Sequence, residues 1–378
     1  MVYPWRMHDI QYHAIIFTQD ANGGPGVPKM ELDPDMLNVT WQASLNFPGQ
    51  AAFTMTRFDP KLALFEYMKD HIKVYRTSAA GTVCVFSGKV IKPSKGPRDT
   101  IVFCWDYVSF LQRSRTGYKV LYPNKLIGTE IMQPEWALAK AAGTSPFAFV
   151  ADGTFENPLG LDGTTPIKVN SQFGMLDFDR LFTFHALAEM SMANTSNTVV
   201  FEITRDVPHT FNFWKNRSTQ QGTWALTYPG NLIDYSLDTG HDEIVNDLAT
   251  PIVDATTGAQ TEYVLTDAGS IAAYRRLQSA VTIKTLYGIT SGTTETDQQK
   301  AALARIITQA VQVPKLLTAF PRQGEIDPFV GWDLGDSFRV TLQNPDRVGD
   351  ELDTYLKCVG MSVAYTPAAG ELIQLYMR

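Results

Sequence analysis

The sequence predicts a β-dominated α+β protein that is divided into several units. At 378 residues the chain is longer than one ordinary hydrophobic core accommodates, so we expect two to four domains. Apolar residues make up 44% of the chain, and its 21 Phe, 15 Tyr and 7 Trp provide enough large side chains for packed interiors. Runs that alternate apolar and polar residues dominate both ends of the chain, whereas helical periodicity is confined to its middle.

The segment from Gly331 to Arg378 predicts three strands that need partners from elsewhere in the chain. Phe338, Val340 and Leu342 alternate with polar neighbours, which is the pattern of a half-buried strand. A second run over 355–365 bends at Gly360, and after a turn at 366–370 the run 372–377 returns as a third strand. Three strands cannot enclose a core, so we expect earlier strands to complete it.

Residues 1 to about 115 predict a compact antiparallel β-unit. Strands are expected over 9–17, 39–47, 51–57, 71–76, 82–92 and 100–110. Pro48-Gly49 supplies turn chemistry between the second and third of these strands. A barrel is the most plausible form, because so many sequential strands would otherwise leave apolar edges exposed.

From about residue 116 the pattern becomes mixed. Helices are expected over 134–142, 176–192 and 296–312, a short helical or turn element over 270–277, and a strand over 198–204. Thr296 and Gln299 form a capping box for the third helix, which Pro314 ends. The segment 145–165 is rich in Gly, Asp and Pro and is expected to be an exposed loop.

Charge and cysteine usage exclude several classes of protein. The net charge of -7, with no run rich in Lys and Arg, argues against a surface that grips nucleic acid. The three cysteines, Cys84, Cys104 and Cys358, are odd in number and lie in strand-like segments, so we expect buried reduced thiols. The sequence has neither a signal-peptide core nor a run of about 20 apolar residues, so we expect folding in a cytoplasm.

No motif assigns a catalytic, cofactor-binding or metal-binding residue, and we predict that the chain is not an enzyme. The nucleophile elbow, the phosphate loop, the dinucleotide-binding glycines and the zinc-binding helix are all absent from the sequence. Five weaker groupings have ordinary structural alternatives, namely solvated or surface residues for the polar groups and packing for the aromatic one. They are His8 with His13 for a metal, His185 with Glu189 as an acid/base pair, Asp234, Ser236, Asp238 and Asp242 around Gly240 for calcium, Asp350, Glu351 and Asp353 as paired carboxylates, and Trp214, Trp224 and Tyr228 for sugar stacking.

Four segments together resemble the central tail-hub proteins of long-tailed bacteriophages (siphophages), also known as baseplate hub or tail-tip minor tail proteins. They are the hairpin Trp41 to Arg57 with its Asn46-Phe47-Pro48-Gly49 turn, followed by Val74-Tyr75-Arg76 and Val85 to Val90; Asp234 to Asp238 leading to Val245-Asn246-Asp247; Gly269 to Arg276 followed by the alanine-rich helix before Pro314; and Trp332 to Asp336 with the strands after it. These strings mark turns and strand starts, and their order spans nearly the whole chain.

The resemblance implies a fold and an assembly. Each subunit of that family has two small β-barrels similar to the tail-tube fold, and a homotrimer forms a pseudo-sixfold ring. For this chain, the resemblance implies a first barrel over 1–115, a peripheral α+β domain over 116–200, second-barrel strands with inserted helices over 201–325, and closing strands over 326–378.

The resemblance also implies a non-enzymatic structural virion protein of the tail tip that is assembled in the cytoplasm of the host bacterium. Its partners would be the distal tail protein, the tape-measure protein and tip or fibre proteins, with no cofactor. During ejection DNA would pass through the channel without specific binding, and we expect Asp and Glu to line the bore. A carbohydrate-binding adhesion module of the tail tip is the alternative, and a β-rich hydrolase is a third possibility that lacks a convergent acid/base set.

Overall fold

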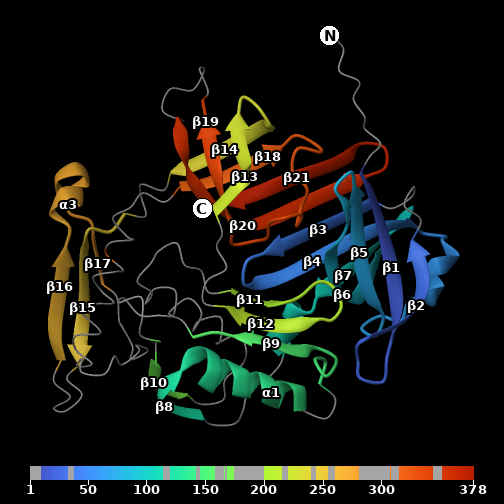
Figure 1. Cartoon of the computed structure of the whole chain (residues 1–378), viewed down its shortest axis with the longest axis horizontal. Helices are drawn as coiled ribbons and strands as arrows, with labels where there is room; N and C mark the ends of the chain where they lie inside the picture. The colour runs from blue at the N-terminus through green and yellow to red at the C-terminus, as the bar shows by residue number, and fades with distance from the viewer. Residues whose placement is uncertain are drawn as a thin grey trace.

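The structure is a computed structural model. It describes residues 10–32, 38–113, 120–141, 145–157, 166, 168–173, 200–214, 220–239, 244–253, 260–280, 307, 315–343 and 351–378. Strands dominate these residues, which confirms the predicted β-dominated fold class (Figure 1). The helices expected over 176–192 and, apart from Ile307, over 296–312 lie outside the described residues.

Seven antiparallel strands form the N-terminal half of the fold. They are β1 (Gln11–Gln19), β2 (Pro25–Leu32), β3 (Asn38–Ser44), β4 (Phe47–Thr56), β5 (His71–Ser78), β6 (Gly81–Lys95) and β7 (Asp99–Asp106), with the 3-10 turns η1 (Pro60–Leu64) and η2 (Val108–Arg113). They pair in the order β3-β4-β7-β6-β5-β1-β2, and this confirms the predicted strands. Among the described residues the pairing is an open path that ends at β2, so closure into a barrel remains a prediction.

The expected turn at Pro48-Gly49 is wrong, because both residues lie inside β4. The chain reverses instead at Leu45 and Asn46, and Asn46 adopts a φ of 61°, which Asn tolerates better than most residues. Gly49 is required by close packing. A Cβ at this position would lie 2.9 Å from both the Gln42 carbonyl oxygen and the Asp106 Oδ2 atom.

The C-terminal strands pair with earlier strands, as predicted. The elements are β13 (Gln220–Tyr228), β14 (Leu232–Thr239), β18 (Lys315–Pro321), β19 (Ser337–Leu342), β20 (Leu352–Thr366) and β21 (Gly370–Met377). One row runs β14-β18-β21-β20, and β13 joins β20 through β19. The register between β20 and β21 shifts between Cys358 and Gly360, where the sequence predicted a bend.

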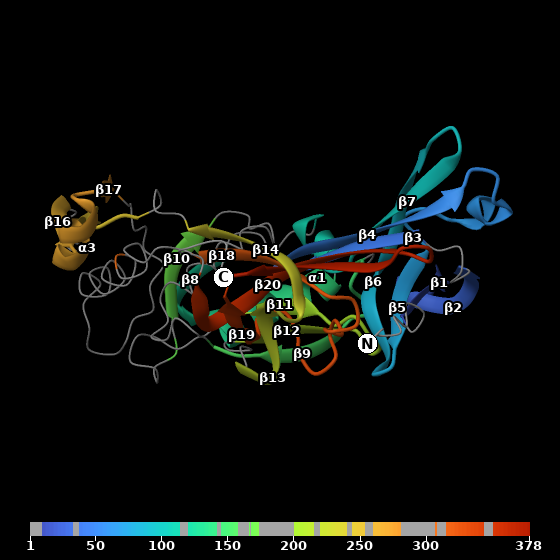
Figure 2. The ribbon, with the colours of Figure 1, turned by 90° about the horizontal axis from the view of Figure 1, so that it is seen from above.

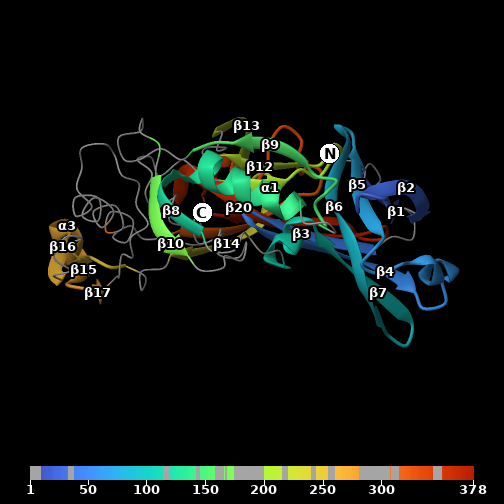
Figure 3. The same ribbon diagram turned by 90° about the horizontal axis from the view of Figure 1, so that it is seen from below.

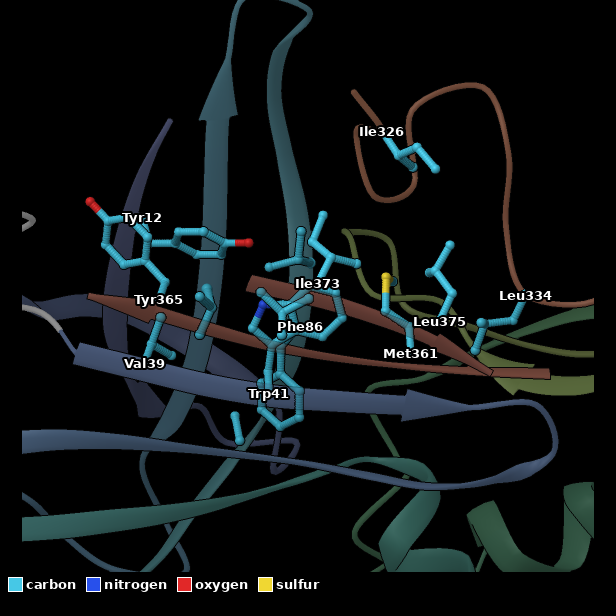
Figure 4. Close-up of a cluster of buried hydrophobic side chains, with 14 of the residues drawn as sticks. Tyr12, Val39, Trp41, Phe86, Ile326, Leu334, Met361, Tyr365, Ile373 and Leu375 are labelled. Atoms are coloured by element: carbon cyan, nitrogen blue, oxygen red, sulfur yellow. The ribbon is translucent and has the colours of Figure 1, made fainter. Parts of the chain in front are cut away.

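The two halves share one 13-stranded sheet, because β20 also pairs with β3. The register runs from Ser44 opposite Gly360 to Val39 opposite Tyr365. Side chains from both halves therefore meet in one hydrophobic cluster, in which Trp41 and Met361 are almost fully buried (Figure 4). The predicted domain boundaries remain predictions, but the core runs through both halves.

A smaller α+β unit packs below this sheet in Figure 1. It contains β8 (Val120–Leu126), the π-turn η3 (Ile127–Met132), α1 (Gln133–Ala141), β9 (Ala151–Phe155), β10 (Lys168–Phe173), β11 (Val200–Ile203) and β12 (Thr210–Trp214). It has its own hydrophobic cluster, where Trp136 of the predicted helix stacks on Phe211 at a ring separation of 4.3 Å. β11 confirms the strand predicted over 198–204.

The prediction of an exposed loop over 145–165 is wrong for its first part. Phe147 and Val150 are each only 1% exposed, and β9 pairs in parallel with β12. The Gly and Asp content suggested a loop, but pairing with a distant strand outweighs that local preference. Residues 158–165 lie outside the described residues.

A third group of elements lies apart from the others at the left of Figure 1. It consists of β15 (Asp247–Val253), β16 (Gln260–Thr266), α3 (Ala268–Tyr274) and β17 (Gln278–Ala280). Asp267 caps α3 by accepting a hydrogen bond from the Ser270 N–H, which accounts for the short helical element predicted there.

Candidate assembly surface

The middle of one face of the shared sheet is open, and its outward residues there are uncharged on five adjacent strands. Side chains alternate along β7, β4, β3, β20 and β21, so every second residue points away from the hydrophobic core. We call the outward set the open face, and it comprises Ile101, Phe103, Gln50, Ala52, Thr54, Thr40, Gln42, Ser362, Ala364, Leu372, Gln374 and Tyr376. A shallow groove crosses it at the β3–β20 junction. The open face therefore joins the two halves of the molecule.

A basic arm projects from one end of this sheet. Figure 2 views β3, β4 and β20 nearly edge on, with β1, β5 and β13 on one side of them and the tips of β4 and the β6–β7 hairpin extending to the other. Figure 3 shows the same arm from below. The arm, residues 54–64 and 92–101, carries five basic residues against two acidic ones: Arg57, Lys61, Lys92, Lys95 and Arg98 against Asp59 and Asp99. Phe58 beside Arg57 is 87% exposed.

The edge strand β14, which ends the strand path on the C-terminal side, carries exposed acidic residues. β14 is the last strand there, and Asp234, Ser236 and Asp238 are exposed on it in alternation with Tyr235, which is buried, and Leu237, which is half-buried. In the register with β18, Asp234 lies opposite Phe320 and Asp238 opposite Leu316, a residue that is 44% exposed. We call Asp234 and Asp238 with these neighbours the acidic border. The sheet thus carries a basic arm on β4, β6 and β7 and two exposed Asp side chains on the edge strand β14.

A buried ion-pair network connects the two halves on the core side of the sheet. Arg76 of β5 donates from Nε and Nη2 to both carboxylate oxygens of Glu371 in β21, at 2.8 and 2.9 Å. Neither side chain is exposed, and Arg76 also pairs with Asp327. Tyr12 donates its hydroxyl to Glu371, and burial is the main cause that raises the pKa of Tyr12 well above its ordinary value. Such a bidentate pair fixes the position of β5 relative to β21, a strand with which it does not pair.

A cleft lies where the two halves meet the lower α+β unit. Arg205 stacks over the Phe329 ring at 3.5 Å from its centroid and donates to Asp333 Oδ1 at 2.6 Å. Asp106 in its wall accepts the Gly49 N–H at 2.6 Å and both the N–H and the hydroxyl of Ser109. Burial raises the pKa of Asp106 to about 6. These groups connect three segments of the chain through hydrogen bonds within the protein.

Two buried histidines support the same junction. His71 bonds through Nδ1 to the Tyr107 hydroxyl at 2.8 Å, and His209 Nδ1 lies 2.7 Å from the Thr204 carbonyl oxygen. Burial, assisted by Lys89, lowers the pKa of His71 to about 3, and burial also lowers the pKa of His209. Both rings are therefore neutral at pH 7 and pack edge to face with Phe149.

The residues named in the sequence analysis do not converge on one site. Asp234 and Asp238 lie on a regular strand, Asp353 pairs with Arg339 on the surface, and Trp224 and Tyr228 pack against the core. His13 stacks on Tyr75. His8, His185, Glu189, Asp242, Asp350 and the side chain of Trp214 lie outside the described residues. The three cysteines are free and buried, as predicted.

The described residues hold no group of three His, Cys, Asp or Glu side chains placed for a metal ion. Within the same part of the chain, no helix has both the length and the apolar character that a membrane span requires. Sequence reasoning missed the Arg76, Asp327 and Glu371 network. The available signal was a charged residue among the apolar inward residues of each of two strands, Arg76 in β5 and Glu371 in β21. Nothing in the sequence shows that these two residues contact each other.

Solved structures of phage tail proteins have the same arrangement of the chain, although neither a protein-family model nor a curated protein sequence matches it. A tail protein from Neisseria meningitidis MC58 superposes with a TM-score of 0.59 at 10% identity, covering 97% of this chain and 96% of that one. The 43 kDa tail protein of prophage MuSo2 from Shewanella oneidensis gives 0.56 at 12% identity, covering 97% and 98%. Prophage tail protein gp18 from Listeria monocytogenes EGD-e gives 0.54 at 11% identity, covering 97% and 94%. The chain therefore has the fold of these phage tail proteins over nearly its whole length, as the resemblance in its sequence implied.

Proposed function

We propose that this chain is a structural subunit of a phage tail tip. Three copies form a pseudo-sixfold hub ring around the tail axis, each contributing its two β-halves, which we expect to be two small barrels of the tail-tube type. The ring continues the tube channel, connects the tube, the distal tail protein and the tape-measure protein to tip or fibre proteins, and assembles in the host cytoplasm. The observation that carries this proposal is the near-complete match of the fold to three phage tail proteins.

The open face is the surface that we assign to the bore. A channel that passes DNA rapidly must avoid clustered Lys and Arg, since such clusters bind phosphates. The open face is built from Thr, Ser, Gln, Ala and a few apolar residues, with Asp234 and Asp238 beyond it on β14. It meets this requirement with neutral side chains, whereas the sequence led us to expect Asp and Glu, rather than Lys and Arg, along the bore.

The adhesion alternative receives no support from Trp224 and Tyr228, the described side chains of the predicted sugar-stacking group. Trp224 and Tyr228 pack against the core, and Tyr228 makes an edge-to-face contact with Tyr235 at 5.1 Å. A sugar-binding platform needs aromatic faces that are open to solvent. A structural role without enzymatic activity therefore remains our proposal.

Electron microscopy of particles that contain this chain tests the proposal. We expect three copies around the tail axis, with the open face toward the channel. Copies placed away from the axis would exclude a hub and favour an adhesion role, which binding to host cell walls would then test. A ring whose bore is lined by the basic arm would refute our assignment of the bore surface.

A further inference from the structure

We propose that the basic arm of one copy docks on the acidic border of the next copy, so that copies associate head to tail. This inference rests on the proposed ring and names the two surfaces that would form it. The two surfaces are different patches of one sheet: the acidic border lies on β14, the first strand of the pairing path, whereas the arm is formed where β4, β6 and β7 extend beyond the middle of that path. A contact between unlike patches is heterologous, and it closes into a ring when the rotation from copy to copy is a whole fraction of a turn.

Charge complementarity indicates that the partner of the basic arm is the acidic border of a second copy. The whole chain carries a net charge of -7, yet the arm concentrates five basic residues against two acidic ones. Lys95 and Arg98 are exposed at its tip, and the structure gives neither side chain an ion-pair partner within the described residues. The acidic border offers Asp234 and Asp238, both exposed, as the opposite charges. Attraction between such patches fixes register and accelerates encounter.

Apolar surface accompanies the charges on both sides. Phe58 on the arm is 87% exposed, and Leu64, also on the arm, is 51% exposed. On the acidic border, Leu316 is 44% exposed beside Asp238. An exposed aromatic ring next to basic side chains is typical of the centre of an interface, where aromatic and Arg residues are enriched.

The direction of the arm fits a ring whose open face is turned inward. The arm leaves the sheet on the side opposite β1 and β5, which is the side of the open face (Figure 2). Each sheet in a closed ring must bend toward the axis where it meets its neighbour. An end that turns toward the open face satisfies that requirement.

Charge reversal followed by sedimentation velocity, from about 1 to about 300 µM protein, tests the contact. The wild-type chain is expected to form trimers that weaken as salt rises. Lys95→Glu with Arg98→Glu is expected to weaken association at least about tenfold, and Asp234→Lys with Asp238→Lys to do the same. The variant that combines all four changes restores opposite charges and is expected to recover association to within about threefold of wild type.

The matched control is Lys69→Glu with Lys125→Glu, which changes the net charge by the same amount. Each substitution removes one exposed ion pair, that of Lys69 with Glu66 or that of Lys125 with Glu130. The control is expected to associate like wild type, and circular dichroism confirms that each variant is folded.

Three results would overturn the inference. Trimers that are unaffected by the arm variants would leave the proposed ring intact and move its interface elsewhere. A wild-type chain that stays monomeric throughout would refute the contact, whereas the ring itself is decided by microscopy of the particle. Tight binding of a short DNA duplex that is lost in the arm variant would assign the arm to nucleic acid instead.

Discussion

At the scale of single residues, the junction between the halves depends on buried charge. Arg76 and Glu371 lie 295 positions apart, and the side chain of each is 0% exposed. Removing one member of such a pair leaves an uncompensated charge in the interior, whereas removing both costs much less. The network therefore specifies how β5 meets β21 more than it adds net stability.

We expect Arg76→Met to lower the free energy of unfolding by about 3–5 kcal/mol, because Glu371 is left buried without its partner. Adding Glu371→Met should recover at least about half of that loss. Urea unfolding followed by Trp fluorescence measures both values. A loss of less than about 1 kcal/mol in the single variant would mean that water reaches Glu371.

The buried His71 should make stability depend on pH. Its pKa is about 3 in the folded protein and about 6.5 in the unfolded chain, so the unfolded chain binds more protons between these values. Stability from this group is fully present above about pH 6.5 and is lost progressively as the pH falls toward 3. Asp106 opposes this trend between pH 3.8 and about 6, because its folded pKa is raised.

We therefore compare His71→Gln with wild type by urea unfolding from about pH 7.5 to pH 4.5. The variant should lose less stability over this range, with Asp106→Asn in both proteins to remove the opposing group. Parallel pH profiles for the two proteins would show that His71 is not the responsible residue.

At the scale of elements, close approach between strands decides which residues the sheet accepts. A Cβ on Gly88 of β6 would lie 1.9 Å from the Trp105 carbonyl oxygen of β7, a backbone atom that cannot move without breaking the pairing. At Gly222 of β13, by contrast, no atom lies within 4 Å of the place where a Cβ would be. A side chain is therefore excluded at Gly88 but can be accommodated at Gly222.

Gly88→Ala should destabilise the protein by about 3 kcal/mol or more, or prevent folding, because it separates β6 from β7. Gly222→Ala should change stability by less than about 1 kcal/mol. Thermal unfolding of both variants measures the difference. Equal melting temperatures for the two variants would contradict the strand spacing described for β6 and β7.

At the scale of the whole molecule, the two halves should unfold as one cooperative unit. They share the β3–β20 pairing, the Arg76 network and one hydrophobic cluster. Regions joined by such contacts open together and show similar protection from hydrogen exchange.

Ser362→Pro tests this cooperativity, because proline removes a backbone donor in the middle of β20. We expect the protection of Val74 in β5 and of Val340 in β19 to fall by similar factors in hydrogen-exchange mass spectrometry. If Val340 loses protection while Val74 keeps it, the halves are independent domains that only touch.

Local patterns predicted much of this structure. Alternation located most strands of the N-terminal half and the closing strands β19, β20 and β21, and α1 followed from helix signals. The pattern did not locate β9, whose strand form depends on pairing with β12, or the partner of β20, since nothing local encodes a neighbour over 300 residues away. The assembly surface was missed for the same reason. Arg57 and Lys95 form one basic arm only because the end of β4 and the end of β6 both pair with the start of β7.

The pairing of β3 with β20 also has a consequence in time. Ser44 and its partner Gly360 are 316 positions apart, which the ribosome covers in roughly 15 to 60 s at bacterial speeds of about 5–20 residues per second. Throughout that interval the edge of β3 beside Trp41 lacks the strand that completes the sheet. The nascent chain must therefore stay soluble with an unfinished edge, and synthesis rate and chaperone access will affect how much of the protein folds correctly.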